Sequence, residues 1–446
     1  MNGQNTALLT DLYQLTMMQA YRREGMSDTA TFELFVRKLP PNRNFLVAAG
    51  LEQLIEYLEN FKFSEEECEW LSTLADFTPE FIAYLSSLRF TGDVHALPEG
   101  SVFFQNEPIV RVTAPISEAQ IVETRLINII QLQSMIASKA VRAVLEAPGK
   151  LLVDFGLRRA HGAEAGLMAA RAAYLAGFDG TSNVFAGKLF DIPIYGTMAH
   201  SYIMAHDDEA EAFERFAESL PNNVLLLIDT YDTLKSAQKV VALAARLAAK
   251  NIAVKGVRLD SGDLVELAKG VRSILDDGGL SECTIFASGD LDEHELSRML
   301  EAGAPIDGFG VGTRLTTSQD MPYLNCAYKL QEYAGRPRRK RSKGKENWPG
   351  RKQVYRCYGD DGHMLHDVIA EETEPRAEGE PLLRQVMAQG KRIGAQETLS
   401  VMRERLRGQL QQLPPTLKAI GEARAYPVLI SEGLQRLVER MDSEGL

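Results

Sequence analysis

The chain of 446 residues is poor in cysteine, tryptophan and histidine, of which it has four, two and seven. Its cysteines, Cys68, Cys283, Cys326 and Cys357, form no closely spaced pair, which argues against a zinc knuckle or a disulfide scaffold and is typical of a reducing compartment. No apolar run is long enough to span a membrane, and the first residues lack the pattern of a signal peptide. These absences favour a cytoplasmic protein without a membrane partner.

An excess of positive charge is also absent. The formal net charge is −12, which disfavours binding to nucleic acid. Only the segment 335–345, "GRPRRKRSKGK", runs against this balance. The simplest interpretation is an exposed loop, and a role in attracting anionic substrates is the alternative. No Walker A motif occurs, so any ATP must be bound in another way.

The sequence does contain a repeated alternation of strand and helix patterns. Strand-like runs begin at Leu151, Asp179, Ile192, Val224, Val254, Cys283 and Pro305, each ending in a polar or glycine-rich tip. This alternation is typical of a parallel sheet, and about seven such strands favour an irregular barrel over an open sheet. Residues 90–115 instead predict antiparallel strands, followed by a helix over 117–145.

In a parallel α/β barrel the loops that follow the strands converge, so the strand tips contain the candidate site residues. The tips are 154–159, 181–183, His200 with Ser201, 229–232, 258–263, 288–290 and 310–314. Several aspartates among them point to magnesium carrying a phosphorylated substrate. "GFGVGTR" offers consecutive backbone N–H groups to a phosphate, although a tight turn would look the same.

Single residues at these tips leave alternatives open. Arg258 lies on the same side of its strand as Asp260 and could bind a carboxylate or phosphate, or form an internal salt bridge. His200, beside a serine at a strand mouth, either fills a packing slot or does chemistry. Near the N-terminus a helix capped by Thr10 or Asp11 would place Tyr13, Met17 and Tyr21 on one face, as core or against an aromatic ligand.

Seven motifs, in order, resemble those of nicotinate phosphoribosyltransferases, a family of type II phosphoribosyltransferases. They are "TDLYQLTM", "DFGLRRAHG", "FDGTSNVFAG", "GTMAHSY", "GVRLDSGDL", "FASGDLDE" and "GFGVGTRL", and the likeness extends through "PGRKQVYR" to Arg356. The resemblance implies an irregular α/β barrel with a second α/β domain formed from the N- and C-terminal segments. The predicted domains are 1–116, with a leading helix; 117–335, the barrel with the active site; and 336–446, the basic loop and a segment packing back on the N-terminal domain.

The resemblance also implies an activity. In this family nicotinate and phosphoribosyl pyrophosphate give nicotinate mononucleotide and pyrophosphate, with Mg2+ and ATP hydrolysis, for NAD salvage. Such an enzyme is an ATP-coupled glycosyltransferase, also classed as a ligase, and usually a homodimer. His200 would be phosphorylated by ATP, and we take Asp229 as the group that orients its imidazole.

Further roles are carried over by the matching motifs. Asp260 is expected at the ribose hydroxyls; Ser288, Gly289 and Asp290 along the ribose and diphosphate; Gly310, Gly312 and Thr313 at the 5′-phosphate. Phe155 and Tyr13, the latter from the other subunit, would sandwich the pyridine ring. Arg258 would face the nicotinate carboxylate and Arg158 the diphosphate. Asp260 and Asp290 are the candidate Mg2+ ligands.

Ser182 helps to choose between relatives. In the related nicotinamide enzymes an aspartate stands at this position, and its charge would repel nicotinate by about 1 kcal/mol or more at an effective dielectric constant of about 20. Serine therefore favours the acid as substrate. The alternatives are a nicotinamide phosphoribosyltransferase, a quinolinate phosphoribosyltransferase without the ATP-linked histidine, or a catalytically silent homologue that acts as a binding protein. His161, His206 and His294 are interpreted as surface or supporting residues.

Overall fold

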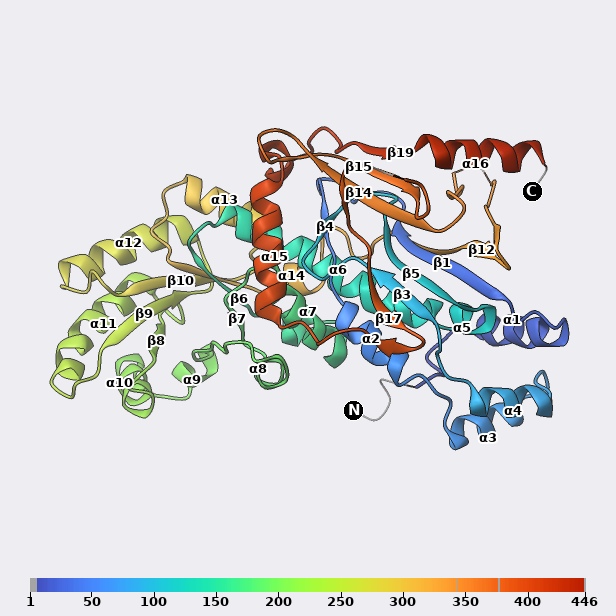
Figure 1. Cartoon of the computed structure of the whole chain (residues 1–446). Helices are drawn as coiled ribbons and strands as arrows, with labels where there is room; N and C mark the ends of the chain where they lie inside the picture. The colour runs from blue at the N-terminus through green and yellow to red at the C-terminus, as the bar shows by residue number, and fades with distance from the viewer. Residues whose placement is uncertain (1–5, 343, 376–377, 445–446) are drawn as a thin grey trace. The chain divides into compact units, whose positions relative to one another are not determined.

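The computed structural model describes residues 6–342, 344–375 and 378–444, so Lys343 of the basic segment lies outside the described residues. The chain divides into two compact units (Figure 1). Unit 1 combines Met1–Ser138 with Tyr323–Leu446, and unit 2 is Lys139–Pro322. The second domain built from both chain ends, expected from the sequence, is confirmed.

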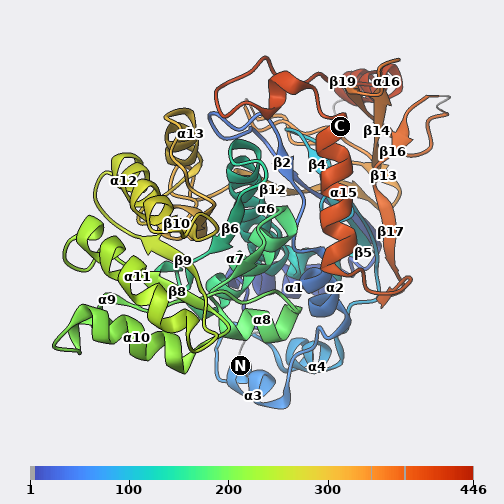
Figure 2. The same ribbon diagram turned by 90° about the vertical axis from the view of Figure 1, so that its left-hand side faces the viewer.

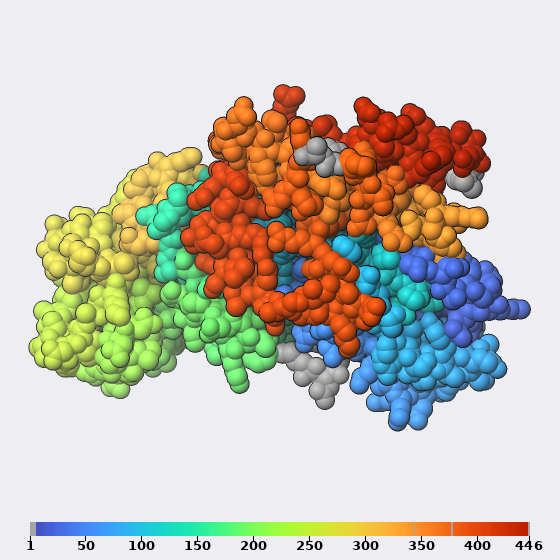
Figure 3. Space-filling view, viewed as in Figure 1, coloured from blue at the N-terminus to red at the C-terminus, as the bar shows by residue number. Residues whose placement is uncertain are grey.

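Unit 1 is held together by a sheet to which both ends of the chain contribute. Its seven strands run in the order β13-β12-β1-β5-β3-β17-β18. Strand β12 (Cys326–Tyr333) pairs with β1 (Thr29–Val36), which in turn pairs with β5 (Pro108–Pro115), all antiparallel. In Figure 3 the N-terminal residues in blue and cyan and the C-terminal residues in orange and red form one continuous surface of this unit.

The remaining elements of unit 1 complete this arrangement. The strands are β2 (Leu46–Val47), β3 (Asp93–Ala96), β4 (Val102–Phe103), β13 (Arg336–Pro337), β14 (Lys352–Tyr358), β15 (Met364–Glu371), β16 (Glu380–Pro381), β17 (Arg384–Ala388), β18 (Lys391–Arg392) and β19 (Val428–Ile430). The helices are α1 (Leu12–Arg23), α2 (Leu51–Glu59), α3 (Glu65–Ser72), α4 (Pro79–Ser87), α5 (Ile116–Ile121), the first part of α6 (Glu123–Glu146), α15 (Leu399–Gln412), a 3-10 turn (Pro415–Lys418) and α16 (Glu432–Ser443).

The boundaries of the two units along the chain differ from those of the predicted domains. Sequence patterns placed the boundaries at 116/117 and 335/336, whereas the units divide at 138/139 and 322/323. The predicted helix over 117–145 is two helices, α5 and α6, separated at Val122. The first part of α6 belongs to unit 1 because the hydroxyls of Ser134 and Ser138 accept hydrogen bonds from the backbone N–H groups of Ala49 and Val47.

Unit 2 is built on a six-stranded parallel sheet with the order β7-β6-β11-β10-β9-β8 (Figure 2). Its strands are β6 (Leu151–Asp154), β7 (Gly180–Thr181), β8 (Val224–Leu227), β9 (Val254–Leu259), β10 (Thr284–Ser288) and β11 (Gly308–Val311). The seventh predicted strand, from Ile192, contributes an isolated parallel bridge between Ile194 and Thr181. The α/β class is confirmed, and the barrel takes the form of a half-barrel sheet.

Helices connect the strands of unit 2 in the expected alternation. They are a 3-10 turn (Leu157–Arg159), α7 (Ala163–Ala176), α8 (Val184–Phe190), α9 (His200–Met204), α10 (Glu209–Ser219), α11 (Thr233–Ala248), α12 (Leu264–Asp277), α13 (Glu293–Glu301) and α14 (Thr313–Thr316). In Figure 2, α10, α11 and α12 lie along one side of the sheet.

Aspartate side chains cap four helices of unit 2, three of which follow strands of the sheet. Asp208, Asp232, Asp263 and Asp292 stand immediately before α10, α11, α12 and α13, and each accepts a hydrogen bond from a backbone N–H of its helix. Such caps stabilise a helix start by about 1 kcal/mol. The sequence placed Asp232 and Asp263 among the candidate site residues at the strand tips. In the structure they are helix N-caps.

Candidate functional site

The carboxyl ends of the parallel strands bring the predicted site residues together. Asp154 is level with Thr181 on β7, Ser288 is level with Gly310 on β11, and Leu259 on β9 is level with Ala287 on β10. Residues that immediately follow these positions therefore share one edge of the sheet. The expectation that the strand tips converge holds for unit 2.

His200 lies at the start of α9 and faces two other strand ends. Its Nδ1 is 3.1 Å from Oγ1 of Thr230, and its Nε2 is 4.0 Å from Oδ2 of Asp260. The side chain is 41% exposed, so the imidazole is accessible and does not fill an apolar packing slot. The ring is thus fixed at one nitrogen, while the other points towards a carboxylate.

The structure corrects the orienting partner expected for His200. Thr230, and not Asp229, forms the hydrogen bond to Nδ1. Asp229 Oδ2 instead accepts hydrogen bonds from the backbone N–H of Asp260 at 3.0 Å and from the hydroxyl of Ser261 at 2.6 Å. Asp229 therefore shapes the turn that holds Asp260. Nothing in the sequence distinguished the two neighbouring side chains, because the chain leaves the regular strand at Leu227.

Asp260 is the centre of a hydrogen-bonded cluster. Its Oδ1 accepts hydrogen bonds from Nη2 of Arg258 at 2.7 Å and from the hydroxyl of Ser288 at 2.5 Å. Arg258 Nε also donates to the oxygen of Ser288 at 2.8 Å. Burial by itself raises the pKa of Asp260, but the Ser288 hydrogen bond and the Arg258 charge outweigh it and lower that pKa. Asp260 is therefore a carboxylate at neutral pH, and the internal salt bridge foreseen for Arg258 is present.

Phe155 forms an aromatic surface beside this cluster. Its ring centroid is 5.4 Å from the guanidinium carbon of Arg258 and 5.7 Å from the ring centroid of Phe286. Gly310 lies against the ring, since a Cβ built there would be 2.5 Å from Cδ2 and 2.7 Å from Cε2 of Phe155. An aromatic ring and a cation this close together can bind a flat ligand that carries a negative charge.

Asp154 connects the turn of Phe155 to the turn of Ser182. Its carboxylate accepts hydrogen bonds from the backbone N–H of Gly156 at 2.8 Å and from the hydroxyl of Thr181 at 2.7 Å. The backbone N–H of Ser182 donates to the carbonyl of Asp154 at 2.8 Å. Burial raises the pKa of Asp154, which the two hydrogen bonds only partly offset. This aspartate is buried, so its role is to join neighbouring loops.

The turn after β10 has an unusual backbone. Gly289 has φ of +103°, and a Cβ there would lie 2.0 Å from the carbonyl oxygen of Asp260. Asp290 follows with φ of +50°, a left-handed conformation that non-glycine residues seldom adopt. Its carboxylate accepts a hydrogen bond from Nη2 of Arg314 at 2.7 Å. The triplet "SGD" is therefore a specific turn whose glycine allows close approach of two strand ends.

Other predicted site residues are placed individually. Gly312 and Thr313 lie just beyond β11, at the start of α14. Arg158 is exposed in the 3-10 turn after β6. Tyr13 belongs to unit 1 and is 47% exposed on α1, so it is not part of the core of that unit. The buried face of α1 is Gln14, Leu15 and Met18. Asp11 is at the predicted cap position, yet its carboxylate accepts from Thr124.

The carboxylates of unit 2 supply only some of the ligands that a magnesium ion needs. No group of three or more histidine, cysteine, aspartate or glutamate side chains gathers as a metal cage within the described ranges. Asp229 Oδ1, however, is buried and has no hydrogen-bond partner among the described residues. Asp229 also bonds directly to the backbone of Asp260. This pair fits the usual magnesium site, in which one or two carboxylates and substrate phosphates supply the ligands.

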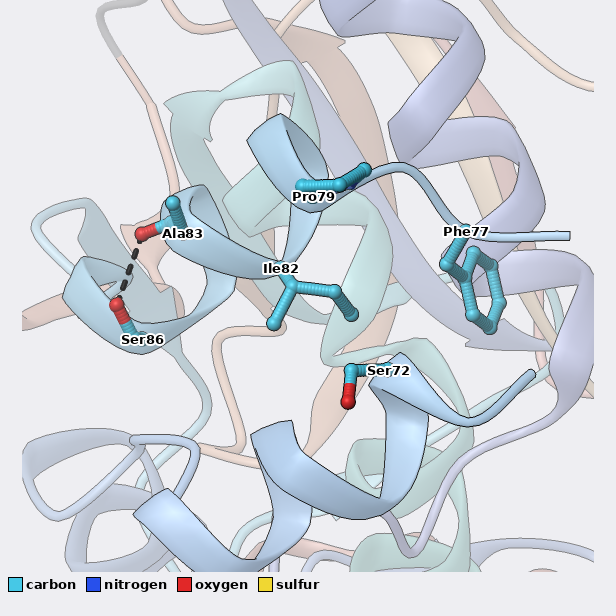
Figure 4. Close-up of a pocket in the computed structure, with 6 residues that line it drawn as sticks. All are labelled: Ser72, Phe77, Pro79, Ile82, Ala83 and Ser86. Carbon is cyan, nitrogen blue, oxygen red and sulfur yellow. Dashed lines mark hydrogen bonds between the residues drawn. The ribbon is translucent and has the colours of Figure 1, made fainter. Parts of the chain in front are cut away.

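Two of the hollows in unit 1 differ in their chemistry. The first, about 340 Å³, lies between α3 and α4, and it is lined by Ser72, Phe77, Pro79, Ile82, Ala83 and Ser86 (Figure 4). None of these residues titrates, so they supply no group for acid–base or metal chemistry. The second, about 280 Å³, is lined in part by Arg37, Lys329, Lys340 and Lys345. Lys340 and Lys345 of the basic segment are exposed there, as expected for an exposed loop, and Glu123 lines the same hollow; attraction of anionic substrates stays a prediction.

Comparisons with known proteins agree with this geometry. Residues 8–131 match the nicotinate phosphoribosyltransferase N-terminal domain, 151–344 the nicotinate phosphoribosyltransferase family and 376–438 its C-terminal domain. Nicotinate phosphoribosyltransferase pncB2 of Mycobacterium tuberculosis is 50% identical over 428 residues, covering 96% of this chain and 92% of that protein. Nicotinate phosphoribosyltransferase of Bacillus subtilis is 43% identical over 372 residues, covering 82% and 76%.

Solved structures give the same result. The human nicotinic acid phosphoribosyltransferase has a TM-score of 0.89 and is 30% identical, covering 97% of this chain and 99% of that one. Nicotinate-nucleotide pyrophosphorylase from Pyrococcus furiosus has a TM-score of 0.75 and is 26% identical. None of the helices in the described part of the chain is long and apolar enough to cross a membrane. The three matched segments and the extent of these likenesses establish that the chain belongs to the nicotinate phosphoribosyltransferase family.

Proposed function

We propose that the protein transfers the phosphoribosyl group of phosphoribosyl pyrophosphate to nicotinate, forming nicotinate mononucleotide and pyrophosphate for NAD salvage. The observation that carries the proposal is the placement of the Arg258 guanidinium 5.4 Å from the Phe155 ring, beside the Asp260 carboxylate. Nicotinate is an aromatic ring bearing a carboxylate, and this arrangement offers a surface for the one and a cation for the other. The relatives named for this activity support the same conclusion.

Nicotinate is expected to lie on the ring of Phe155 with its carboxylate towards Arg258. Arg258 Nη1 is 3.4 Å from the hydroxyl of Thr197 and 3.5 Å from the carbonyl of Met198, distances too long for strong hydrogen bonds. That nitrogen is the part of the guanidinium best placed to turn to a ligand. Tyr13 of a second subunit would cover the other face of the pyridine ring in a homodimer.

The phosphoribosyl donor is expected along the neighbouring strand ends. Asp260 accepts hydrogen bonds from the ribose hydroxyls, Ser288, Gly289 and Asp290 follow the ribose and diphosphate, and Gly310, Gly312 and Thr313 bind the 5′-phosphate. Arg158 is expected near the diphosphate. Magnesium, bound with its phosphates, would neutralise the leaving pyrophosphate. Asp260 remains its expected ligand; Asp229, with its unpartnered oxygen, is better placed as the second than Asp290, which is paired with Arg314.

Catalysis then depends mainly on position and charge. As pyrophosphate departs, the bond from the sugar carbon to its oxygen breaks, and positive charge develops on that carbon. The pyridine nitrogen supplies the electron pair for the new bond. The carboxylate of Asp260 stabilises the developing charge, and Phe155 and Arg258 hold the ring in line. No side chain has to act as a strong base.

ATP is expected to phosphorylate His200. The Thr230 oxygen can accept a hydrogen bond from Nδ1–H, which keeps the proton on Nδ1 and leaves the lone pair of Nε2 free to attack the γ-phosphorus. A phosphorus–nitrogen bond forms, the bond to the β-phosphate oxygen breaks, and ADP leaves. The phosphoimidazole is later hydrolysed.

The four free cysteines fit a cytoplasmic location, where thiols stay reduced.

A product assay tests the proposal. Purified protein is incubated with phosphoribosyl pyrophosphate, Mg2+ and either labelled nicotinate or labelled nicotinamide, with and without ATP. We expect nicotinate mononucleotide as the main product and faster formation with ATP. Preferential conversion of nicotinamide would identify the nicotinamide enzyme. Failure to convert either base would identify a silent homologue.

The Gly310→Ala substitution should weaken nicotinate binding. The new methyl group would lie 2.5 Å from the Phe155 ring and 3.1 Å from Phe286, so the stacking ring has to move. Overpacking of this kind costs about 1–3 kcal/mol, which corresponds to an increase in the KM for nicotinate of roughly 5- to 150-fold if the cost falls on binding. Steady-state kinetics measure it. Gly421→Ala is the matched control, because its Cβ meets open space. Equal KM values in both variants would contradict a stacking role for Phe155.

The Ser182→Asp substitution should shift the preference of the enzyme towards nicotinamide. A carboxylate at this position would repel the carboxylate of nicotinate and accept a hydrogen bond from the amide. We expect the ratio of kcat/KM for nicotinate to that for nicotinamide to fall by about tenfold or more, from a repulsion of about 1.4 kcal/mol. Ser182→Asn adds a similar volume without the charge and serves as the control. An unchanged ratio in Ser182→Asp would show that Ser182 does not contact the pyridine substituent.

A further inference from the structure

Arg314 joins two turns that follow adjacent strands. Its Nη2 donates to Oδ2 of Asp290 at 2.7 Å, and its Nη1 donates to Oδ2 of Asp292 at 3.0 Å. Asp290 and Asp292 belong to the turn after β10, whereas Arg314 follows β11 directly after the Gly312–Thr313 pair. One guanidinium therefore binds two carboxylates across a strand pair through two fixed N–H groups, a planar fork that the single ammonium of lysine lacks.

One side of this contact is rigidly anchored. Asp292 caps α13, accepting from the backbone N–H groups of His294 and Glu295. The next residue, Glu293, is almost completely buried and bonds to Lys139 at 2.7 Å and to Arg142 at 2.7 Å. Burial tends to raise the pKa of Asp292, and its hydrogen bonds from Glu295 and Arg314 lower it overall. The start of α13 is thus a fixed point from which Arg314 can hold the loop after β11.

The other side of the contact is strained. Asp290 keeps its left-handed conformation at φ of +50°, which costs a non-glycine residue about 1 kcal/mol or more unless its surroundings enforce it. Its side chain is 68% exposed, and the guanidinium of Arg314 is the cation with which it forms an ion pair. Asp290 belongs to the turn whose Ser288 bonds to Asp260. Release of Asp290 would therefore disturb the proposed donor site from both adjacent strands.

We propose that Arg314 is a positioning residue for the phosphoribosyl donor, holding the 288–292 turn against the 310–313 loop in the arrangement that binds the donor's ribose and phosphates. The inference rests on the proposed function. It predicts an effect mainly on the donor, because Arg314 itself bonds to neither Phe155 nor Arg258, and Arg258 is also held by Asp260.

The test compares Arg314→Ala and Arg314→Lys with wild type. We expect the KM for phosphoribosyl pyrophosphate to rise about tenfold in the alanine variant and less in the lysine variant, which keeps the charge but loses the fixed fork of the guanidinium. The KM for nicotinate and kcat at saturating donor should stay within about twofold of wild type. Added guanidinium ion at low millimolar concentration should partly restore the alanine variant. Arg298→Ala, which removes an exposed arginine on α13 paired with Glu295, is the control.

Several results would overturn the inference. An unchanged KM for the donor in Arg314→Ala does so, as does a parallel rise of both KM values without rescue by guanidinium. If the alanine variant does not fold, Asp292→Asn replaces it: asparagine still caps α13 but loses the charge that binds Arg314. Donor binding is also measured by calorimetry with phosphoribosyl pyrophosphate and Mg2+. Wild type that binds the donor without turnover contradicts the proposed function alone, and equal affinity in Arg314→Ala contradicts only the role of Arg314.

Discussion

The Asp260→Asn substitution is expected to lower kcat/KM for transfer to nicotinate about a thousandfold, because it removes a charge and little else. Asparagine has nearly the same shape and can still accept the hydrogen bonds from Ser288 and Arg258. A carboxylate about 4 Å from a developing positive charge contributes about 4 kcal/mol at an effective dielectric constant of about 20, which corresponds to a factor of about a thousand in rate. Steady-state kinetics with saturating Mg2+ measure the loss.

The control for this prediction is the last residue of the same motif. Asp263 in "DSGD" caps α12 through the backbone N–H groups of Val265 and Glu266, and asparagine caps a helix equally well. Asp263→Asn should therefore keep wild-type activity. Urea unfolding of both variants separates a catalytic loss from a folding defect. If Asp260→Asn retains kcat/KM within about threefold of wild type, its charge does not stabilise the transition state.

The same substitution has a consequence for the pH dependence of stability. The pKa of Asp260 is lowered in the folded protein, so its ionised form stabilises the fold at any pH above the value of an unfolded aspartate, about 3.9. That contribution is lost as the pH falls through the lowered pKa. The Asp260→Asn variant lacks this contribution. The free energies of unfolding of wild type and variant should therefore become more similar as the pH falls. At neutral pH the variant should be the less stable of the two, because Arg258 loses its charged partner.

The fold of unit 2 was predictable because local patterns and topology agree. The strands from Leu151, Val224, Val254 and Cys283 are short apolar runs followed by helical patterns, and parallel pairing with helical connections is the arrangement that buries both. The half-barrel form was not predictable. Whether a sheet closes depends on the pairing at its edges, and the run from Ile192 provides only one bridge, between Ile194 and Thr181.

The candidate site was predictable as a set of loops but not as a set of contacts. The prediction grouped His200, Asp260, Ser288 and Gly310 because segments that follow parallel strands share one edge of the sheet. The structure places these residues close together. The choice between Asp229 and Thr230 at His200 depends on side-chain direction in an irregular turn, and no periodicity describes such a turn. Arg314 was recognised only as part of a glycine-rich loop, because the carboxylates that it binds lie more than twenty residues earlier in the chain.

The His200→Ala substitution is expected to abolish the response to ATP while leaving a slow, ATP-independent transfer. The imidazole is the only group at this strand edge for which we propose covalent phosphorylation, and Thr230 holds it with Nε2 facing Asp260 at 4.0 Å. With [γ-32P]ATP, wild type should become labelled in an acid-labile form and the variant should not. In the presence of ATP, kcat/KM for the donor should fall about a hundredfold, as the loss of a nucleophile implies.

His206 supplies the matched control for His200. It lies just beyond the same helix, its Nδ1 is 2.9 Å from the carbonyl of Tyr202, and its ring lies 4.8 Å from the ring of Tyr202. His206→Ala should retain both the labelling and the ATP response. Thr230→Val should slow labelling without abolishing it, because Nε2 remains but the tautomer is no longer fixed. Acid-labile label on His200→Ala, or stimulation of that variant by ATP, would show that another residue carries the phosphoryl group. His200, facing Asp260, would then only position the substrate.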